Sequence, residues 1–259
     1  MINELALNTG ADIPFIPAAI STHVPRLKEI ALIGEESFFI GYEFLKISKN
    51  KLTVTQGDNS ALKDKSDFDI LMILLSGKQK NFQKERTCAL MVLSLLFPDY
   101  QIKIKTTEIL LYKDEPKESH SLNNRNYPQF KEVLTTLVPL DNQQMEYNPS
   151  GDLAKQIAEK LKQAAQKKAQ LAPVQQKVSI FERYLSILAV GECKDKNELA
   201  NYTPYQIIDE YKRFMLKQNY DITFKKKMLG AKGTKDAEDW QKDLNEPDEE
   251  SQSMQLVYT

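Results

Sequence analysis

Few side chains in this sequence could hold a metal ion. The softest candidate ligands are two histidines and two cysteines, at His23, Cys88, His120 and Cys193. No two of them are near each other along the chain, so the short spacings typical of zinc sites are missing from the sequence. We therefore predict no metal and no other cofactor. Cys88 falls on the apolar side of an expected helix, which indicates a small buried thiol.

The two histidines also lack the partners that would indicate nucleophilic catalysis. Both lie in segments expected to be loops, and no G-x-S-x-G motif accompanies either of them. The adjacent acids Glu35 and Glu36 would point about 100° apart on a helix, which indicates a solvated face and not a catalytic pair. The sequence therefore predicts a protein that is not an enzyme. A histidine beside an acid in a concave pocket would favour the opposite conclusion.

Two further patterns bear on phosphate groups. The segment Gly230–Lys235 contains glycine, lysine and threonine, but their order differs from that of a P-loop, and a glycine-ended helix explains them more simply. Lysines cluster within residues 155–168 and at Lys225–Lys227, and the first cluster has no interleaved aromatic residues. Lys and Arg number 35 against 36 Asp and Glu, a net charge of -1, so a nucleic-acid partner is disfavoured.

The composition is that of an ordinary water-soluble protein. Of the 259 residues, 41% are hydrophobic and 27% are charged, which is enough apolar material for a real core. No apolar run approaches the roughly 18 residues of a membrane span, and Met1–Gly10 lacks the pattern of a secretory leader. Two distant cysteines fit a reducing compartment. We therefore expect a cytoplasmic protein with no membrane partner.

The first 147 residues predict an α+β domain. Pro14 and Pro17 keep the segment Ile13–His23 extended. A helix led by Pro25 could continue beyond Gly34 through an aromatic-rich stretch. Further helices are predicted over residues 67–75, 81–97 and 127–138, strands over residues 53–60 and 100–112, and a loop over residues 113–125.

A breaker at Asn148–Gly151 marks the predicted end of this domain. The connector helix that follows, residues 148–175, is rich in Lys, Gln and Ala. Its one narrow apolar stripe includes Ile157 and Leu161. A helix with so narrow a stripe is either an extended connector or a surface that awaits a partner.

A helical module is predicted over residues 176–245. Its helices begin at two capping boxes, Ser179–Glu182 and Thr203–Gln206. Asp221 is expected to cap one further helix, and an acidic tail, residues 246–259, is expected to be disordered. The predicted fold is therefore mainly α with a small β component, with an α+β N-terminal domain followed by a helical C-terminal module.

The C-terminal half also carries an ordered series of residues. The series resembles bacteriophage tail assembly chaperones and the baseplate hub assembly proteins of T4-like contractile phages. It covers roughly residues 127–244, and none of its motifs is catalytic. Its members are Asn148-Pro149 before Ala154–Leu161, then Tyr184–Gly191, Leu199 with Thr203–Ile207, Tyr211–Phe214 before Gln218–Asp221, and Gly230–Lys232 before Glu238–Trp240.

The resemblance implies a role in building a phage tail. Tail assembly chaperones are thought to coat the long hydrophobic helices of the tape-measure protein and to help recruit tube subunits, and hub assembly proteins act on the central baseplate. The implied partners are therefore tape-measure, hub or tube proteins, and the implied location is the host cytoplasm. A structural baseplate or tail component retained in the virion is the main alternative, and a nucleic-acid-associated protein is the third.

The physics of helix binding indicates which residues would contact such a partner. An amphipathic helix lays anchors at i, i+3, i+4 and i+7 into an apolar groove. The alternative interpretation is that the tyrosines and the tryptophan complete the core of the module. The predicted partner-binding residues are Ile157 and Leu161 on the connector, and Tyr205, Ile208, Tyr211 and Trp240 in the module.

Overall fold

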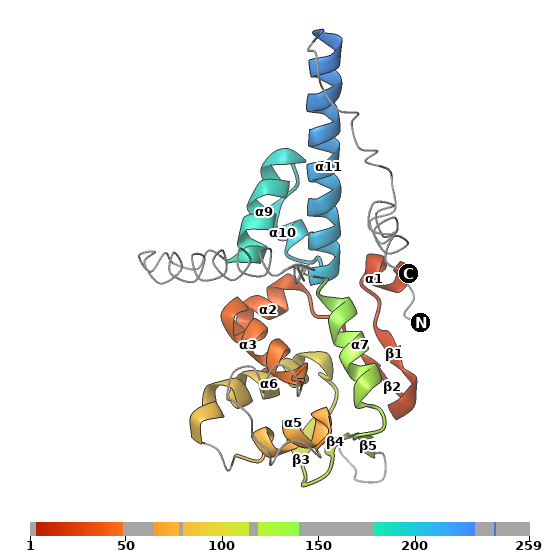
Figure 1. The fold of residues 1–259 in the computed structure, drawn as a ribbon, viewed down its shortest axis with the longest axis vertical. Helices are drawn as coiled ribbons and strands as arrows, with labels where there is room; N and C mark the ends of the chain where they lie inside the picture. The colour runs from red at the N-terminus through yellow and green to blue at the C-terminus, as the bar shows by residue number, and fades with distance from the viewer. Residues whose placement is uncertain are drawn as a thin grey trace, which may run out of the picture.

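The computed structural model confirms a mainly α-helical chain with two small antiparallel sheets (Figure 1). The predicted strand at residues 53–60, the breaker at Asn148–Gly151, the connector helix and the acidic tail lie outside the part that the structure describes. That part comprises residues 4–48, 65–77, 80–113, 119–139, 179–230 and 241.

The N-terminal segment forms a helix and a hairpin. Helix α1, Glu4–Thr9, was not predicted. The extended segment after it is confirmed as strands β1, Ile13–Phe15, and β2, Ile20–Thr22, which pair antiparallel and are joined by the 3-10 turn Ile16–Ala18. The alternation of buried and exposed residues along both strands turns one face of the hairpin towards the core.

The expected continuation of the next helix across Gly34 is wrong. Helix α2, Leu27–Ile33, ends where Gly34 adopts a φ of +84°, and α3, Glu35–Leu45, begins immediately after it. A φ of this sign suits glycine and interrupts a right-handed helix. Helix α3 then packs closely on α6, because a Cβ added at Gly41 would lie 2.3 Å from the carbonyl oxygen of Cys88.

Helices α5 and α6 follow the predicted pattern. Helix α5, Asp67–Leu75, is capped by Ser66, whose hydroxyl accepts from the backbone N–H of Asp69 at 3.1 Å. Helix α6, Gln83–Leu96, follows the short 3-10 turn Lys80–Phe82 and buries the Cys88 thiol as expected.

The second sheet corrects two predictions. The strand expected over residues 100–112 is a hairpin of β3, Gln101–Ile104, and β4, Ile109–Tyr112. The expected loop at residues 113–125 contains a third strand, β5, Ser119–Leu122, paired with β4. The sequence of β5 is SHSL, in which Leu122 is the one apolar residue and the one that is fully buried. It therefore shows none of the alternation of apolar and polar residues that predicts a strand. His120 therefore lies on a strand and not in a loop.

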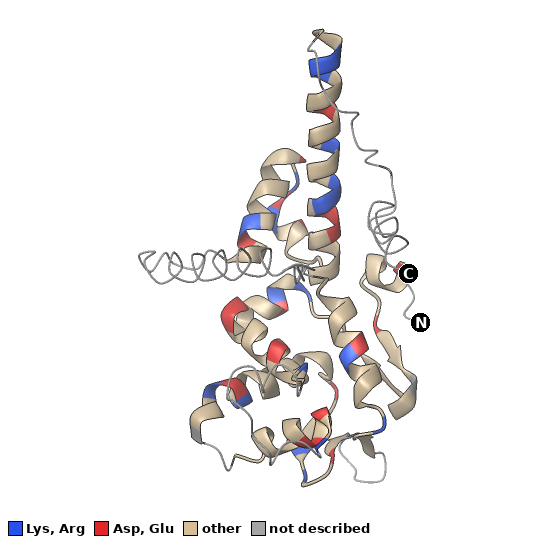
Figure 2. Cartoon of the chain, viewed as in Figure 1, with Lys and Arg blue, Asp and Glu red and all other residues tan. Residues whose placement is uncertain are grey.

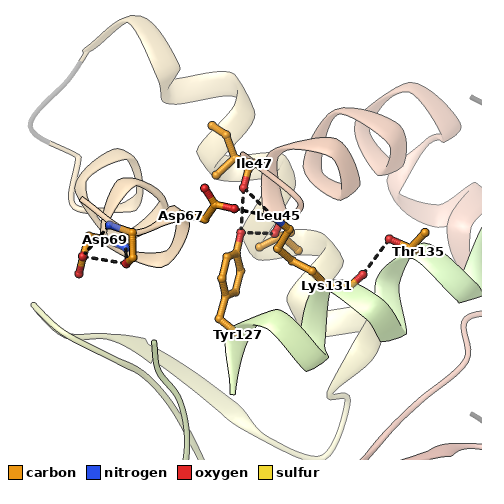
Figure 3. A network of polar contacts seen from close by, with 8 residues as sticks. Leu45, Ile47, Asp67, Asp69, Tyr127, Lys131 and Thr135 are labelled. Carbon is orange, nitrogen blue, oxygen red and sulfur yellow. Dashed lines mark hydrogen bonds and ion pairs between the residues drawn. The ribbon is translucent and has the colours of Figure 1, made fainter. Parts of the chain in front are cut away.

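Helix α7, Tyr127–Leu137, is confirmed. It supplies a hydrogen-bond donor to the C-terminal end of α3. The Tyr127 hydroxyl donates to the carbonyl of Leu45 at 2.9 Å, and the Lys131 ammonium binds Asp67 at 2.8 Å (Figure 3). Burial raises the pKa of Tyr127 well above its ordinary value, so this hydroxyl remains a donor. The end carbonyls of α3 thus find partners on another helix.

The C-terminal module consists of α9, α10 and α11, which are Ile180–Gly191, Lys196–Leu199 and Pro204–Met228. The capping box at Thr203 is confirmed, with Thr203 and Gln206 each accepting from the other's backbone N–H. The prediction that Asp221 caps a further helix is wrong. Asp221 lies inside α11, which continues past it without a break.

The start of α9 is bound by the N-terminal part of the chain. Ser179 caps Glu182 as predicted, but the Glu35 carboxylate supplies the rest of the cap and accepts from the backbone N–H of Ile180 at 2.6 Å. The solvated face predicted for Glu35 and Glu36 therefore holds for Glu36, whose side chain is 72% exposed, and is wrong for Glu35. The Phe181 ring also packs against α3.

One apolar cluster runs through both parts of the described chain. The backbone N–H groups of Leu27 and Lys28 on α2 donate to the carbonyls of Tyr202 and Ala200, at 2.9 Å each. Gln206 donates to the carbonyl of Asn8 at 2.7 Å and ties the base of α11 to α1. The division between residues 147 and 148 stays a prediction, since it lies outside the described residues.

Candidate functional site

The predicted partner-binding residues fall into two groups. Tyr205 and Ile208 are only 6% and 2% exposed, and they lie in the core. They occupy the first turns of α11, where α1, α7 and α9 all contact it. A partner could not reach them in this conformation, so the alternative interpretation as core residues holds for both.

Tyr211 is half-buried, and its ring stacks on that of Tyr184 from α9, with centroids 4.1 Å apart and planes at 15°. This contact joins α9 to α11 and leaves Tyr211 only partly exposed. Ile157, Leu161 and Trp240 lie outside the described residues, and their role stays a prediction.

His23 lies between two carboxylates. Its Nδ1 is 3.0 Å from Asp12 Oδ1, and its Nε2 is 3.1 Å from Glu29 Oε2. Burial alone would raise the pKa of the Glu29 carboxyl, but hydrogen bonds from the Arg26 backbone and from His23 outweigh burial and lower this pKa. The cluster joins the loop before β1 to the first turn of α2.

A surface pocket of about 610 Å³ adjoins this cluster. His23 beside an acid in a concave pocket is the arrangement that would favour an enzyme. However, carboxylates occupy both ring nitrogens, so neither nitrogen is directed at a hydroxyl or thiol that it could activate. The side chains that line the pocket are of mixed charge and include Asp12, His23, Phe97, Asp99, Tyr100 and Lys113.

His120 makes structural contacts. Its Nδ1 lies 2.7 Å from the carbonyl oxygen of Ala18, and its ring meets Tyr100 edge-on. The ring therefore joins β5 to the turn of the N-terminal hairpin. Across the described ranges, no group of three or more His, Cys, Asp and Glu side chains could hold a metal ion.

Several of the exposed large apolar side chains in the described chain gather at the far end of α11. Figure 1 shows the helix rising well past the end of α9. Along it, Ile222 is 48% exposed, Phe224 52% and Met228 74%, and Leu229 just beyond is 88% exposed. Single exposed apolar residues are ordinary, but here Ile222 and Leu229 share one side of the helix and Phe224 and Met228 share the opposite side, so both sides are candidate interaction surfaces.

The last residue of α9 packs closely against α11. A Cβ added at Gly191, the last residue of α9, would lie 2.3 Å from the Phe214 ring. Glycine thus allows the end of α9 to lie directly on that ring. Past the end of α9, no described helix or strand lies beside α11 in Figure 1.

The same end of α11 is basic. Lys225, Lys226 and Lys227 occupy its last turn, where positive charge interacts favourably with the helix dipole (Figure 2). The sequence indicated a solvated face at these lysines, and Lys225 and Lys226 are exposed. The projecting end of α11 thus combines apolar side chains with positive charge.

Compared with known protein families, with curated proteins and with solved structures, the chain has no significant match. Among the residues that the structure describes, no helix has both the length and the apolar character to cross a membrane. The projecting end of α11, with its exposed apolar residues and its lysines, is the candidate protein-binding surface.

Proposed function

We propose that this protein is a bacteriophage tail or baseplate assembly factor that acts by binding another tail protein. The observation that carries the proposal is the projecting end of α11, where Ile222 and Leu229 expose apolar surface on one side of a helix anchored in the folded body. Such a surface suits a helical segment of a partner, because helices associate through apolar anchors on consecutive turns. The resemblance of the C-terminal residues to tail assembly proteins supports the setting.

The His23 cluster supports catalysis less well than α11 supports binding. Its imidazole is held at both nitrogens by Asp12 and Glu29, which suits a fixed structural link. A general base needs one nitrogen directed at the proton that it removes. The proposed factor therefore acts by binding, in the host cytoplasm during assembly.

A structural component retained in the virion is the alternative, and it would use the same surface. The two roles differ in where the protein ends up. An assembly factor is abundant in the lysate and missing from purified particles, whereas a structural component is present in them.

The experiment is a pull-down of the tagged full chain from phage-producing cells, analysed by mass spectrometry together with purified virions. The proposal expects a tail protein with long helices in the pull-down, and no copy of this chain in virions. Presence of the chain among baseplate proteins in virions would establish the structural role. A pull-down without any tail protein would contradict both.

A further inference from the structure

On one side of α11, apolar residues form a seven-residue repeat that extends from the core into solvent. Ile208, Met215, Ile222 and Leu229 follow each other at intervals of seven residues. Seven residues make nearly two helical turns, so these side chains line one side of the helix. Their exposed fractions rise in order, from 2% to 38%, 48% and 88%. We call Met215, Ile222 and Leu229 the distal seam.

Helix α9 already acts as a partner helix for the first part of this repeat. Tyr211, three residues after Ile208, stacks on Tyr184 of α9, and Phe214 lies under Gly191. These positions correspond to those that a neighbouring helix covers in a coiled coil. The repeat continues past the end of α9, so the distal seam has the geometry of a helix–helix contact without the second helix.

The charges of the seam determine what that second helix must carry. Lys225 flanks the distal seam, three residues after Ile222, and Lys226 is the next residue. Among the described carboxylates, none forms an ion pair with either ammonium group. A docked helix needs acidic residues at the matching positions, because like charges there would repel and opposite charges would attract.

We infer that the distal seam docks an amphipathic α-helix with acidic flanking residues, supplied by a partner protein. Apolar anchors of that helix would cover Met215, Ile222 and Leu229, and its carboxylates would meet Lys225 and Lys226. That the partner is a tail protein rests on the proposed function. The apolar and acidic character of the partner helix is inferred from the residues of α11.

The same charges disfavour two other occupants. A second copy of α11 in parallel register would place Lys225 against Lys225. An anionic membrane would attract the lysines, but sinking the seam into hydrocarbon would bury the charge of Lys225 as well. A helix that brings carboxylates satisfies both the apolar residues and the lysines.

The test uses the full chain and three synthetic peptides of equal length. One is an amphipathic helix with leucines at the seam positions and glutamates beside them, one has lysines in place of the glutamates, and one is a scrambled form of the first. Fluorescence anisotropy should show the glutamate peptide binding about 10-fold more tightly than the lysine peptide. Equal binding of all three, or binding of none, would overturn the inference.

Variants of α11 test the location. Ile222→Glu together with Leu229→Glu should weaken binding of the glutamate peptide by about 100-fold. Leu32→Glu is the matched control, since Leu32 is 87% exposed and lies on α2, outside α11. It should leave binding nearly unchanged. Equal weakening by both changes would show that the peptide does not bind at the seam.

Charge reversal tests the acidic partner. Lys225→Glu together with Lys226→Glu should transfer the preference from the glutamate peptide to the lysine peptide. Sedimentation equilibrium tests whether a second copy of the chain occupies the seam. Binding to vesicles of phosphatidylcholine with phosphatidylglycerol tests whether an anionic membrane does. Self-association that Ile222→Glu abolishes would overturn the inference. Vesicle binding that Ile222→Glu abolishes, without any peptide binding, would overturn it as well.

The pull-down separates failure of this inference from failure of the proposed function. A tail protein captured equally well by the wild type and by the Ile222→Glu, Leu229→Glu variant would leave the proposed function standing and overturn the seam. Peptide binding as expected, with no tail protein captured, would contradict the proposed function and support the seam.

Discussion

Helix α11 has two halves that share one repeat but differ in their surroundings. In the first half, Pro204 to Phe214, the apolar side chains lie against α1, α7 and α9, and Ile208 is almost fully buried. In the second half, the same repeat continues to Ile222, which is half exposed. The apolar pattern is therefore common to both halves, and the presence of a neighbour distinguishes them.

The second half depends on local interactions for its helical structure. Three lysines in its last turn complement the helix dipole, and Tyr220 stacks on Phe224 with ring centroids 6.3 Å apart. Such contacts stabilise a helix by a few tenths of a kcal/mol each, which is far less than burial provides. A partner helix would supply the burial that this half lacks.

The largest effect is expected in the covered half. Ile208→Ala removes a fully buried side chain and should lower the free energy of unfolding by about 2–5 kcal/mol. Chemical denaturation followed by circular dichroism measures the change. A loss below about 1 kcal/mol would mean that α11 is not packed into the core at its base.

The junction between the halves should be nearly as sensitive. Gly191→Ala forces a Cβ against the Phe214 ring, and overpacking of this kind costs about 1–3 kcal/mol. Adding Phe214→Leu should recover part of the loss, because the ring is the group that the new methyl meets. An equal loss with and without Phe214→Leu would refute the close contact.

The helix that covers the first half depends on a cap from α3. Glu35→Gln removes the charge that accepts from the backbone of Ile180 and Phe181, and should lower the free energy of unfolding by about 1 kcal/mol. Glu36→Gln is the matched control. Its carboxylate pairs with Lys84 in solvent, so this change should cost much less than Glu35→Gln. Equal losses would mean that Glu35 caps nothing in solution.

The smallest effect is expected in the projecting half. Ile222→Ala occupies the same position of the repeat as Ile208→Ala, two repeats further along. Because Ile222 is 48% exposed, its truncation should change the free energy of unfolding by less than about 0.5 kcal/mol. A loss similar to that of Ile208→Ala would show that the two halves are equally buried.

Local signals in the sequence predicted much of this fold. Ser66 and Thr203 have hydroxyl side chains that cap the first turn of a helix, and both helices begin there as expected. The strand prediction at residues 100–112 missed the turn, because Ile102 and Ile109 are both apolar and the residues between them carry no glycine. Strand β5 could not be predicted, because only one of its side chains is apolar and fully buried, so its sequence has no alternating pattern.

Long-range contacts were beyond such signals. Glu35 caps a helix whose first residue is 145 positions away, and adjacent acids give no indication of that contact. Apolar spacing predicts a binding role for Tyr205 and Ile208, but the same spacing is equally typical of a core. An aspartate such as Asp221 is typical of the start of a helix, and a helix start there would interrupt the seven-residue repeat of α11. Spacing alone does not show where a covering helix ends.

Hydrogen exchange along α11 tests the central claim most directly. In the full chain alone, the backbone amides of residues 208–214 should exchange slowly and those of residues 218–228 quickly, because only the first half is packed. Adding the glutamate peptide should slow exchange in residues 218–228 and leave the first half unchanged. Slow exchange of both halves without peptide, or no change in the second half at saturating peptide, would contradict the claim that the projecting half is an unoccupied helix-binding surface.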